Sequence, residues 1–498
     1  MPNFNWSGTD GGDWTTRTDW KPTGVPGSGD NVFINTAGTY AVTITTEVSA
    51  AAVTLNDVGA ALSDSGALTL AGGVKELSVK SGTFQLNSGG SVVGGTVVAG
   101  PKGVFAWDGG TLDGVTFDGA LSLAGGTVQI ESGITFNGAS GTGAGTIAVN
   151  GGAATLSLIG ATTLDNATLN IGASMAGKVA TVSGSAITFG AKLKFDQTGL
   201  QARVSASASV DNLGSMTLDP KGGHFGLTST KAFINSGTVS VSNGEVVQLH
   251  DAGVTNQASG TISITGAGSS VVLDSADAFS NHGAVTVGTA AVPSDGELVI
   301  DANVMNTNQF IAEGDGSLTI NGALTGAGSV LISTGGSVTL NGAVQSTQNV
   351  FFLDATGTLK LHLPSANSFA GGIAGFSFIN KAIYDKIDLI DAPATTVTST
   401  ATTESAELTV SNGANVVATL DLIGNYVGQK FQVASDLHGG SVITLVQDTS
   451  SVAGAHRFAQ AAAAFAAPTG GADLQPHSAP IGFGMALSVS RALSSGRS

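Results

Sequence analysis

The amino-acid sequence predicts an all-β chain that folds as a right-handed parallel β-helix, a solenoid in which each coil stacks on the one before. Short runs of four to six residues alternate β-forming and small polar residues, as in TYAVTI (39–44) and SVTLNG (337–342), and each ends near Gly, Asn or Ser. Alternation with a period of two marks half-buried strands, and the punctuation marks turns. An internal repeat and an unusual composition point to the same fold.

The repeat lies in the middle of the chain and has the frame apolar–x–Asn–x–Gly followed by alternating β-formers. Its copies are AFINSGTVSV (232–241), GVTNQASGTISI (253–264), which carries an insertion, AFSNHGAVTV (278–287) and a decayed copy, NVMNTNQFIA (303–312).

The aligned asparagines of this repeat are Asn235, Asn256, Asn281 and Asn306, spaced by 21, 25 and 25 residues. A period of 20–50 residues signals a solenoid or a propeller. Each period holds about three short strands and no helix, which favours one coil of a parallel β-helix. We expect each asparagine to lie in a turn and to hydrogen-bond its counterparts in neighbouring coils as a ladder.

The composition suits such a stack. Glycine accounts for 73 of 498 residues, about twice the usual ~7%, whereas charged residues make up 11%, less than half of the usual ~25%. Because every inward residue of a coil faces similar residues above and below, a repeated buried charge would be costly. Hydrophobic residues make up 42% of the chain, which argues against disorder.

The charge and cysteine counts exclude several classes of function. The net charge is −17 with only 18 basic residues, and no basic cluster of the kind that binds phosphates is visible, so the sequence disfavours nucleic acid and anionic membranes as partners. The chain has no cysteine, which excludes disulfides, thiol catalysis and cysteine metal sites. No apolar stretch approaches the ~18 residues of a spanning helix.

We expect four parts in chain order. Residues 1–45 form a Trp-rich N-terminal cap, 46–365 form the coils, 366–447 form a C-terminal β module, and 448–498 form an Ala-rich helix and a flexible tail. At 20–25 residues per coil, the second part holds roughly 13–16 coils.

The N-terminal part contains Trp6, Trp14 and Trp20, three of the four tryptophans of the chain. A stack of coils exposes an apolar end that must be covered, and each large ring can bury ~150–250 Å² there. The alternative is a stacking platform for a sugar, since Thr, Asp and Ser surround the rings.

The C-terminal β module reads as four or five longer strands. The turn SNGA (411–414) lies between two alternating runs and predicts a hairpin. Further on, the Ala-rich run 455–468 is the best helix candidate and ends at Pro468, and the last thirty residues read as a mobile tail.

Candidate chemistry in the coil region consists of three small groups of polar residues. They are Asp196 with Arg203, the loop residues Asp219, Lys221 and His224, and His250 beside Asp251. A solvated loop explains the second group better than a site does, and adjacent strand residues such as His250 and Asp251 point to opposite faces.

A fourth group, Asp385, Asp388 and Asp391, is spaced by three residues in YDKIDLID (384–391). Calcium prefers several oxygen ligands from one loop, but a three-residue step along a strand alternates faces, so a charged strand edge is the preferred interpretation. No zinc motif, nucleophile elbow or phosphate loop is present. The sequence therefore assigns no catalytic, cofactor-binding or metal-binding residue, and no cofactor.

Two sets of short motifs stand near the two ends of the chain. They are W–x–G (6–8), G–D–W (12–14), D–W (19–20) and G–V–P–G–S–G–D–N–V–F–I (24–34), and then G–F (375–376), D–K–I–D–L (385–389), A–T–L–D–L (418–422), G–x–Y–x–G (424–428), F–x–V–A–S–D (431–436) and G–G–S–V–I–T–L (439–445). In these residues the sequence resembles bacterial secreted and cell-surface parallel β-helix proteins of the adhesin-like, autotransporter-passenger-like kind.

This resemblance implies a non-enzymatic protein, extracellular or on a bacterial cell surface, that binds glycans or surfaces through a face of the β-helix. The chain departs from the pattern in two ways, since 447–498 could not form the membrane barrel of an autotransporter and the nonapeptide calcium repeat is missing. The first residues lack the features of a cleaved signal peptide, so by analogy with type I secretion substrates we expect export machinery to read an uncleaved C-terminal signal.

Two other functions stay open. The β-helix scaffold also hosts lyases and epimerases that act on polysaccharides, although the acids of this chain look dispersed. The third possibility is a structural spacer within a larger secreted assembly. For the favoured function, we expect specificity to come from inserted loops such as 210–231 and 288–298.

Overall fold

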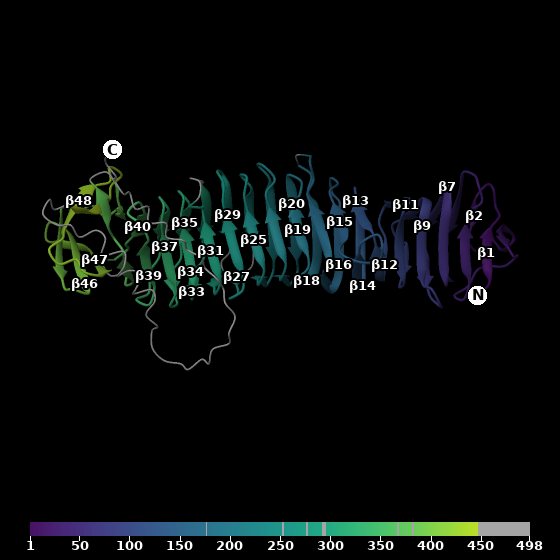
Figure 1. Ribbon diagram of the computed structural model, residues 1–498, viewed down its shortest axis with the longest axis horizontal. Coiled ribbons are helices and arrows are strands. Elements are labelled where there is room, and N and C mark those ends of the chain that lie inside the picture. Colours follow the sequence, from purple (N-terminus) through teal and green to yellow (C-terminus); the bar gives the residue numbers. More distant parts are fainter. Residues whose placement is uncertain are drawn as a thin grey trace, which may run out of the picture.

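The computed structural model shows a parallel β-solenoid of about 14 turns, drawn out as a rod with the N-terminus at one end (Figure 1). It describes residues 1–446 except 176, 251–252, 275–276, 291–294, 366–367 and 381–382. The predicted helix at 455–468 and the tail that follows lie outside the described residues. The all-β prediction is confirmed, and the number of turns falls within the predicted range.

In the middle of the rod, each coil contributes one short strand to each of three faces. The coil that starts at β23 (His224–Ser229) continues through β24 (Ala232–Asn235) and β25 (Thr238–Val241). Each of these strands pairs in parallel with its counterpart in the next coil. The prediction of about three short strands per period is therefore confirmed.

The first face is formed there by β20 (Gln201–Ala206), β23, β26 (Val246–His250), β29 (Ser269–Asp274), β32 (Gly296–Ile300), β35 (Ser317–Ile320), β38 (Ser337–Leu340), β40 (Thr358–His362) and β44 (Lys386–Ile390). The second face is formed by β21 (Ser209–Asn212), β24, β27 (Gly253–Asn256), β30 (Phe279–Asn281), β33 (Val304–Asn306) and β36 (Leu324–Thr325). The third face is formed by β13 (Ala120–Leu123), β15 (Gly145–Val149), β17 (Ala167–Ile171), β19 (Lys194–Gln197), β22 (Ser215–Leu218), β25, β28 (Thr261–Ile264), β31 (Ala284–Val287), β34 (Gln309–Ala312), β37 (Ser329–Ile332), β39 (Asn349–Phe352) and β41 (Gly372–Ala374).

Closer to the N-terminus, single long strands run across two faces and bend between them. These are β7 (Ala52–Asp64), β9 (Glu76–Leu86), β11 (Thr96–Trp107), β12 (Thr111–Asp118), β14 (Thr127–Asn137), β16 (Thr155–Leu164) and β18 (Ala180–Phe189), with the short β8 (Ala67–Leu70) and β10 (Ser91–Val93) between them. Register shifts mark several bends, for instance between Asp113 and Val115 of β12. At such a bulge the strand turns and its outward side chains are re-aimed.

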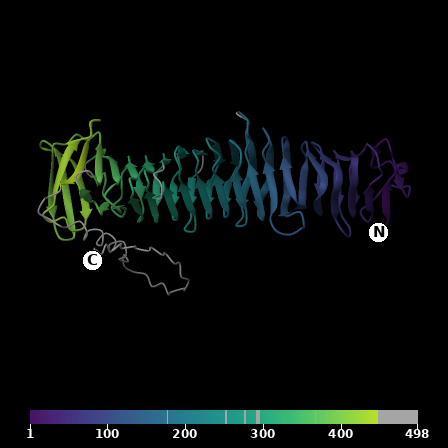
Figure 2. The same cartoon turned by 45° about the horizontal axis from the view of Figure 1, so that its top comes forward.

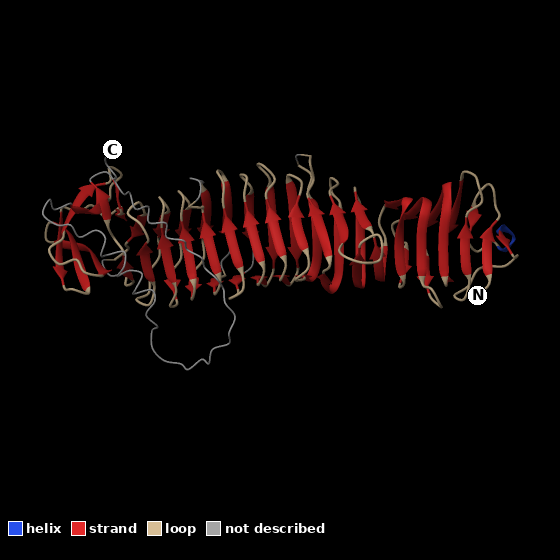
Figure 3. Cartoon of the chain, viewed as in Figure 1, coloured by secondary structure: helices blue, strands red, loops and turns tan. Residues whose placement is uncertain are grey.

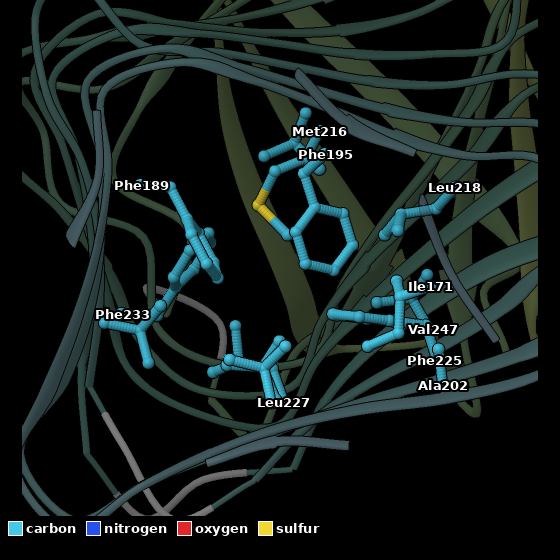
Figure 4. Close-up of a cluster of buried hydrophobic side chains, with 14 of the residues drawn as sticks. Ile171, Phe189, Phe195, Ala202, Met216, Leu218, Phe225, Leu227, Phe233 and Val247 are labelled. Atoms are coloured by element: carbon cyan, nitrogen blue, oxygen red, sulfur yellow. The ribbon is translucent and has the colours of Figure 1, made fainter. Parts of the chain in front are cut away.

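The interior of the rod is a continuous stack of apolar side chains that point inward from all three faces (Figure 4). On the first face, one inward column places similar residues on one another in register and runs through Val182, Val204, Leu227, Leu249, Leu273 and Ile300. Burying each such side chain contributes about 1.5–3 kcal/mol. Aromatic rings extend the same stacking, as with Phe195 and Phe225, whose centroids lie 5.7 Å apart.

A ladder of buried asparagines runs beside this core, as the repeat predicts. Asn235 donates from Nδ2 to Oδ1 of Asn256 at 2.9 Å, and Asn256 donates to Asn281 at 3.0 Å. Asn281 donates to Asn306 at 3.0 Å. Each of these asparagines is the last residue of its strand, and not a turn residue as predicted. Its Nδ2 also donates to a backbone carbonyl oxygen of the next coil.

The ladder extends beyond the predicted asparagines in both directions. It begins at Asn212, which donates to Oδ1 of Asn235 at 2.8 Å. It ends at Gln348, whose Oε1 accepts from Asn306 at 3.1 Å although one whole coil lies between them. That coil has Gly326 at the position opposite Asn306, and the longer glutamine side chain spans the missing rung.

The glycine of the Asn–x–Gly frame has a packing reason. A Cβ on Gly237 would lie 2.0 Å from the carbonyl oxygen of Gly214, its counterpart in the preceding coil. A Cβ on Gly260 would lie 2.3 Å from Oδ1 of Asn256. At these two positions a side chain would collide with the adjacent turn or amide, so glycine lets the turns stack closely.

The N-terminal end of the rod is formed by β1 (Asn3–Trp6), β2 (Gly12–Asp13), the short 3-10 helix η1 (Arg17–Asp19), β3 (Trp20–Lys21), β4 (Asn31–Ile34), β5 (Tyr40–Ile44) and β6 (Glu47–Ala50). Strands β4, β5 and β6 already pair in parallel with β7 and β8 of the next coil. Strand β1 pairs in parallel with β4 and in antiparallel with β3. Among the described residues, η1 is the only helix (Figure 3), and none is long and apolar enough to cross a membrane.

At the other end of the rod, antiparallel strands continue the parallel sheets, as the turned view also shows (Figure 2). They are β45 (Thr396–Ala401), β46 (Ser405–Asn412), β47 (Asn415–Ile423), β48 (Lys430–Ser435) and β49 (Ser441–Val446), with the small pair β42 (Phe378–Asn380) and β43 (Ile383–Tyr384) before them. The predicted hairpin at 411–414 is confirmed, since β46 and β47 pair in antiparallel up to Asn412 and Asn415.

The prediction of an inserted loop at 210–231 is wrong. This range contains strands of all three faces, namely most of β21, all of β22 and all of β23. Residues 219–223 are only the turn between β22 and β23. Of the second proposed loop, 288–298, residues 291–294 lie outside the described part of the chain, and β32 begins at Gly296.

Replacing Asn256 by Ala should lower the free energy of unfolding by about 2–4 kcal/mol, because it leaves the buried amide of Asn235 and the oxygen of Asn281 without partners. Chemical denaturation of the purified chain measures this change. The matched control is Asn170→Ala on the outward face of β17, which should cost less than 1 kcal/mol. Equal effects of the two substitutions would contradict a stabilising ladder.

Candidate functional site

A polar groove of about 720 Å³ lies on the outside of the rod, across three successive coils. Its floor is formed by the outward residues of β10, β12 and β14 and by the glycine-rich turns before β10 and β12. Gly110 has a φ of +84°, and a Cβ there would lie 2.8 Å from the carbonyl oxygen of Asn87, so the turn requires glycine. The missing side chains leave the groove open.

The side chains of the groove form two columns in register. Ser91, Thr111 and Gln129 make the first column, in which the Thr111 hydroxyl donates to Oε1 of Gln129 at 3.3 Å. In the second column, Asp113 lies opposite Glu131 on the neighbouring strand. A third carboxylate, Asp108, accepts from Nε2 of Gln85 at 2.6 Å.

A second groove of about 620 Å³ lies next to the first along the same strands. It is lined by the continuations of β12 and β14 beyond their bends, together with Ile159–Thr163 of β16. The bulge at Asp113/Val115 and the turn at Ser132 and Gly133, where φ is +52° and +80°, separate the two grooves. The rod thus carries a two-part lateral depression where its faces meet.

The chemistry of these grooves suits hydrogen bonding to a polar, uncharged or cationic ligand. Their linings offer serine and threonine hydroxyls, one glutamine amide and the carboxylates Asp108, Asp113 and Glu131. Among the described residues that line the two grooves, none is basic. Like charges repel, so the carboxylates disfavour an anionic ligand.

The first two groups of residues named from the sequence are not among the residues that line the two grooves. Asp196 lies on β19 of the third face and Arg203 on β20 of the first face, so the two side chains belong to different faces of the rod. Lys221 is exposed in the turn before β23, and His224, the first residue of β23, is exposed as well. This exposure agrees with a solvated surface position for these two side chains.

His250 has a cross-strand partner instead of its sequence neighbour. Its Nδ1 lies 3.6 Å from Oδ2 of Asp274, the residue opposite it on β29. Both side chains are substantially exposed, so this pair contributes little to stability. Asp251 lies outside the described residues.

The three aspartates at 385–391 have different surroundings. Asp385 is fully buried and accepts hydrogen bonds from the backbone N–H groups of Gly357 (3.0 Å) and Ser377 (2.8 Å). Asp388 faces outward from β44 beside Lys360, and Asp391 is exposed. In the described part of the chain, no group of three or more His, Asp or Glu side chains has an arrangement that could hold a metal ion.

The three tryptophan rings are not available for stacking on a ligand. Trp6, Trp14 and Trp20 are at most 1% exposed and pack edge to face, with Trp20 4.9 Å from Trp6 and 5.1 Å from Trp14. Trp20 donates from Nε1 to the carbonyl oxygen of Trp14 at 2.7 Å.

One buried acid lies away from the grooves. Glu245, in the turn before β26, is fully buried, and neither of its carboxyl oxygens nor Oε1 of the buried Gln197 has a hydrogen-bond donor. Burial raises the pKa of Glu245 to about 8, the nearby Gln197 side chain opposes this rise, and the charge of Asp219 adds to it. At neutral pH the carboxyl is therefore protonated and can donate to Gln197.

Sequence reasoning missed the grooves. GGTLDG (109–114) carries Asp113 and the glycines of the groove floor, but it matches no motif of a phosphate loop or of a metal site. The signal that could have found them is the alignment of SVV (91–93), TLD (111–113) and QIE (129–131) as successive copies of one strand.

Comparison of the chain with protein-family models, with curated proteins and with solved structures found no match. The site is therefore interpreted from its own geometry.

Stability should fall as pH rises from about 4.5 to about 8, because over this window Glu245 ionises in the unfolded chain but keeps its proton in the fold. Glu245→Gln should remove this part of the pH dependence, so that the variant is more stable than the native chain at pH 9, by on the order of 3 kcal/mol, and differs little at pH 4. Urea denaturation of both proteins at pH 4 and at pH 9 measures this difference in the free energy of unfolding.

The matched control is Glu297→Gln on the outward side of β32, where we expect no such gain. Burial also raises the pKa values of Asp64 and Asp385. These two groups add the same pH dependence of stability to the native chain, to Glu245→Gln and to Glu297→Gln. Parallel pH curves for the native chain and Glu245→Gln would contradict a buried proton at this position.

Proposed function

We propose that the protein is a non-enzymatic, secreted or surface-displayed bacterial adhesin-like or matrix protein that binds glycans through the lateral face of its β-helix. The observation that carries the proposal is the pair of polar grooves at the bends of β12 and β14. Grooves on a long rod can follow an extended chain, and hydroxyl, amide and carboxylate groups are natural partners for sugar hydroxyls.

The charges of the first groove define the glycan class further. Asp108, Asp113 and Glu131 project into one depression of a chain whose net charge is −17. A neutral or amino-substituted glycan fits this environment, whereas a uronic-acid polymer would be repelled. The same argument weakens the alternative of a lyase or epimerase acting on acidic polysaccharides.

One observation favours an enzyme as the second candidate. Asp113 and Glu131 lie opposite each other on neighbouring strands, which are about 4.8 Å apart. Two carboxyl groups about 5–5.5 Å apart can cleave a glycosidic bond with retention, one as nucleophile and the other as acid and base. A polysaccharide-active enzyme would use this pair.

Binding to an array of neutral and acidic glycans tests the proposal. We expect the native chain to bind neutral or amino-substituted glycans, and Asp113→Ala and Gln129→Ala each to weaken binding about 10-fold or more, because each removes a hydrogen bond of ~1–3 kcal/mol. Thr217→Ala on the third face is the control and should bind as the native chain does.

Three other outcomes would contradict the proposal. Binding to acidic glycans alone would overturn the charge argument. Release of sugar products that Asp113→Asn abolishes would establish the enzyme instead. A correctly folded chain that binds no glycan would leave the structural spacer as the better function.

We further propose that Trp6, Trp14 and Trp20 cap the rod. Their rings lie at the N-terminal end of the rod, where β1 pairs with β4, and they are buried against apolar residues of the core. A solenoid needs such a cover because its terminal coil has no neighbour on one side.

Replacing Trp14 by Ala should therefore lower the stability of the N-terminal coils by about 3–5 kcal/mol and open them to proteolysis, without changing glycan binding to the grooves. Thermal denaturation and limited proteolysis with N-terminal sequencing of fragments measure both effects. Val25→Ala, at a position that is 40% exposed, is the control. Unchanged stability in Trp14→Ala would show that the rings do not act as a cap.

A further inference from the structure

An internal cavity of about 30 Å³ lies inside the rod, within the coils that carry β22 to β32. Its lining consists of apolar side chains that come from all three faces. Met216, Phe233 and Val247, one from each face, belong to this lining and point toward the middle of the rod (Figure 4). The cavity is separate from the two polar grooves, which lie on the outside of the rod at β10 to β16.

The cavity has its origin in one inward column of the second face. In this column Val254 lies opposite Phe233 of the coil before and opposite Phe279 of the coil after. The strands of the two phenylalanines are two spacings, or ~9.6 Å, apart, whereas aromatic rings in contact lie ~4.5–7 Å apart. The smaller valine between them therefore leaves part of the column unfilled.

The rest of this coil does not fill the space. It consists of β26, β27 and β28, and none of the residues that these three strands direct inward is aromatic. The inward residues that line the cavity there are Val247, Leu249, Val254 and Ile262. A ring is thus missing from the whole layer, and not only from one column.

The exposed fractions of inward side chains agree with such a void. Leu249 and Ile262 are each 8% exposed although they point into the rod. In the column of Leu249, Val204 and Ile300 lie two coils before it and two coils after it, and both are 0% exposed. The surface of Leu249 and Ile262 that stays free is the part that faces the cavity.

Aromatic contacts bound the space along the rod in both directions. Toward the N-terminus, Phe225 of the lining packs against Phe195 with ring centroids 5.7 Å apart. Toward the C-terminus, Phe279 of the lining packs against Phe310 at 5.8 Å. A guest therefore enters through transient local opening of the coils.

The lining selects an apolar guest. A buried water needs two to four hydrogen-bond partners, and the side chains that line the cavity offer none, so the space stays dry. Atoms that face an empty space lose van der Waals contacts on that side. A small apolar molecule restores these contacts without giving up a hydrogen bond.

We propose that this cavity is a binding site for one small apolar molecule, of about the size of xenon or methane. A water-sized body takes up ~10–15 Å³ of such a cavity, so that about 30 Å³ admits a guest only somewhat larger than water. Sugars and long hydrocarbon chains do not fit.

Xenon NMR of the full-length chain under xenon pressure tests this site. The xenon resonance should shift with protein concentration, and Val254→Ile should weaken the binding about 10-fold or more, because the added methylene takes the place of the guest. The same substitution should keep or raise the melting temperature, since it fills empty space in the core.

The matched control is Val304→Ile. Val304 belongs to the same column, opposite Phe279, but it is 1% exposed and does not line the cavity. This substitution should lower the melting temperature, because it overfills a packed layer, and it should leave xenon binding unchanged.

A second variant tests the site from the opposite direction. Ile262→Val removes a methylene from the wall and should therefore strengthen xenon binding. Absence of a xenon shift in the native chain would overturn the proposal. Equal xenon binding in Val254→Ile and Val304→Ile would overturn it as well, since it would place the bound xenon elsewhere.

Discussion

The structure depends on one constraint. The inward side chains and turn residues of every coil must pack against, and hydrogen-bond to, those at the same positions of the next coil. The inward column from Val182 to Ile300 satisfies it with apolar contacts, and the asparagine ladder satisfies it with hydrogen bonds. An amide is unusual in that it can donate to one neighbour and accept from the other, so identical residues bond in an unlimited series. The glycines of the turns follow from the same constraint, because they keep the turns close enough for the amides to meet.

The outer surface is free of this constraint, and the features that distinguish one part of the rod from another occur there. The grooves form where long strands bend and outward side chains of unlike character come together. One outward column of the third face changes its side chains from the hydroxyl of Thr286 to the apolar Ile311 and Leu331. Buried acids are the exceptions on the inside. Asp385 is supplied with backbone donors, and Glu245 keeps its proton.

The sequence was a good guide wherever the constraint repeats a residue type. Strand alternation and the spacing of four asparagines predicted the coil and the ladder. Asn212 was overlooked although NLG (212–214) has the same frame as NSG (235–237), and the turn that follows was taken for an inserted loop. Gln348 could not be found from the Asn–x–Gly pattern, because it does not belong to a copy of the repeat. Its role in the ladder depends on Gly326, which lies one coil earlier. The pairing of Asp113 with Glu131 was not predictable from spacing, because the two are 18 residues apart and the bulges between them set which residues face each other.

The glutamine that closes the ladder has a consequence for how such a rod can change its length over evolution. Duplication or loss of one coil shifts all later residues by one layer, and a strictly periodic hydrogen-bonded series would be broken by any coil that lacks the required amide. Gln348 shows that a side chain longer by one methylene, placed in a later turn, restores continuity across such a coil. The number of coils can therefore drift while the buried polar series stays intact, and the reach of the protein becomes a quantity that selection can adjust one layer at a time.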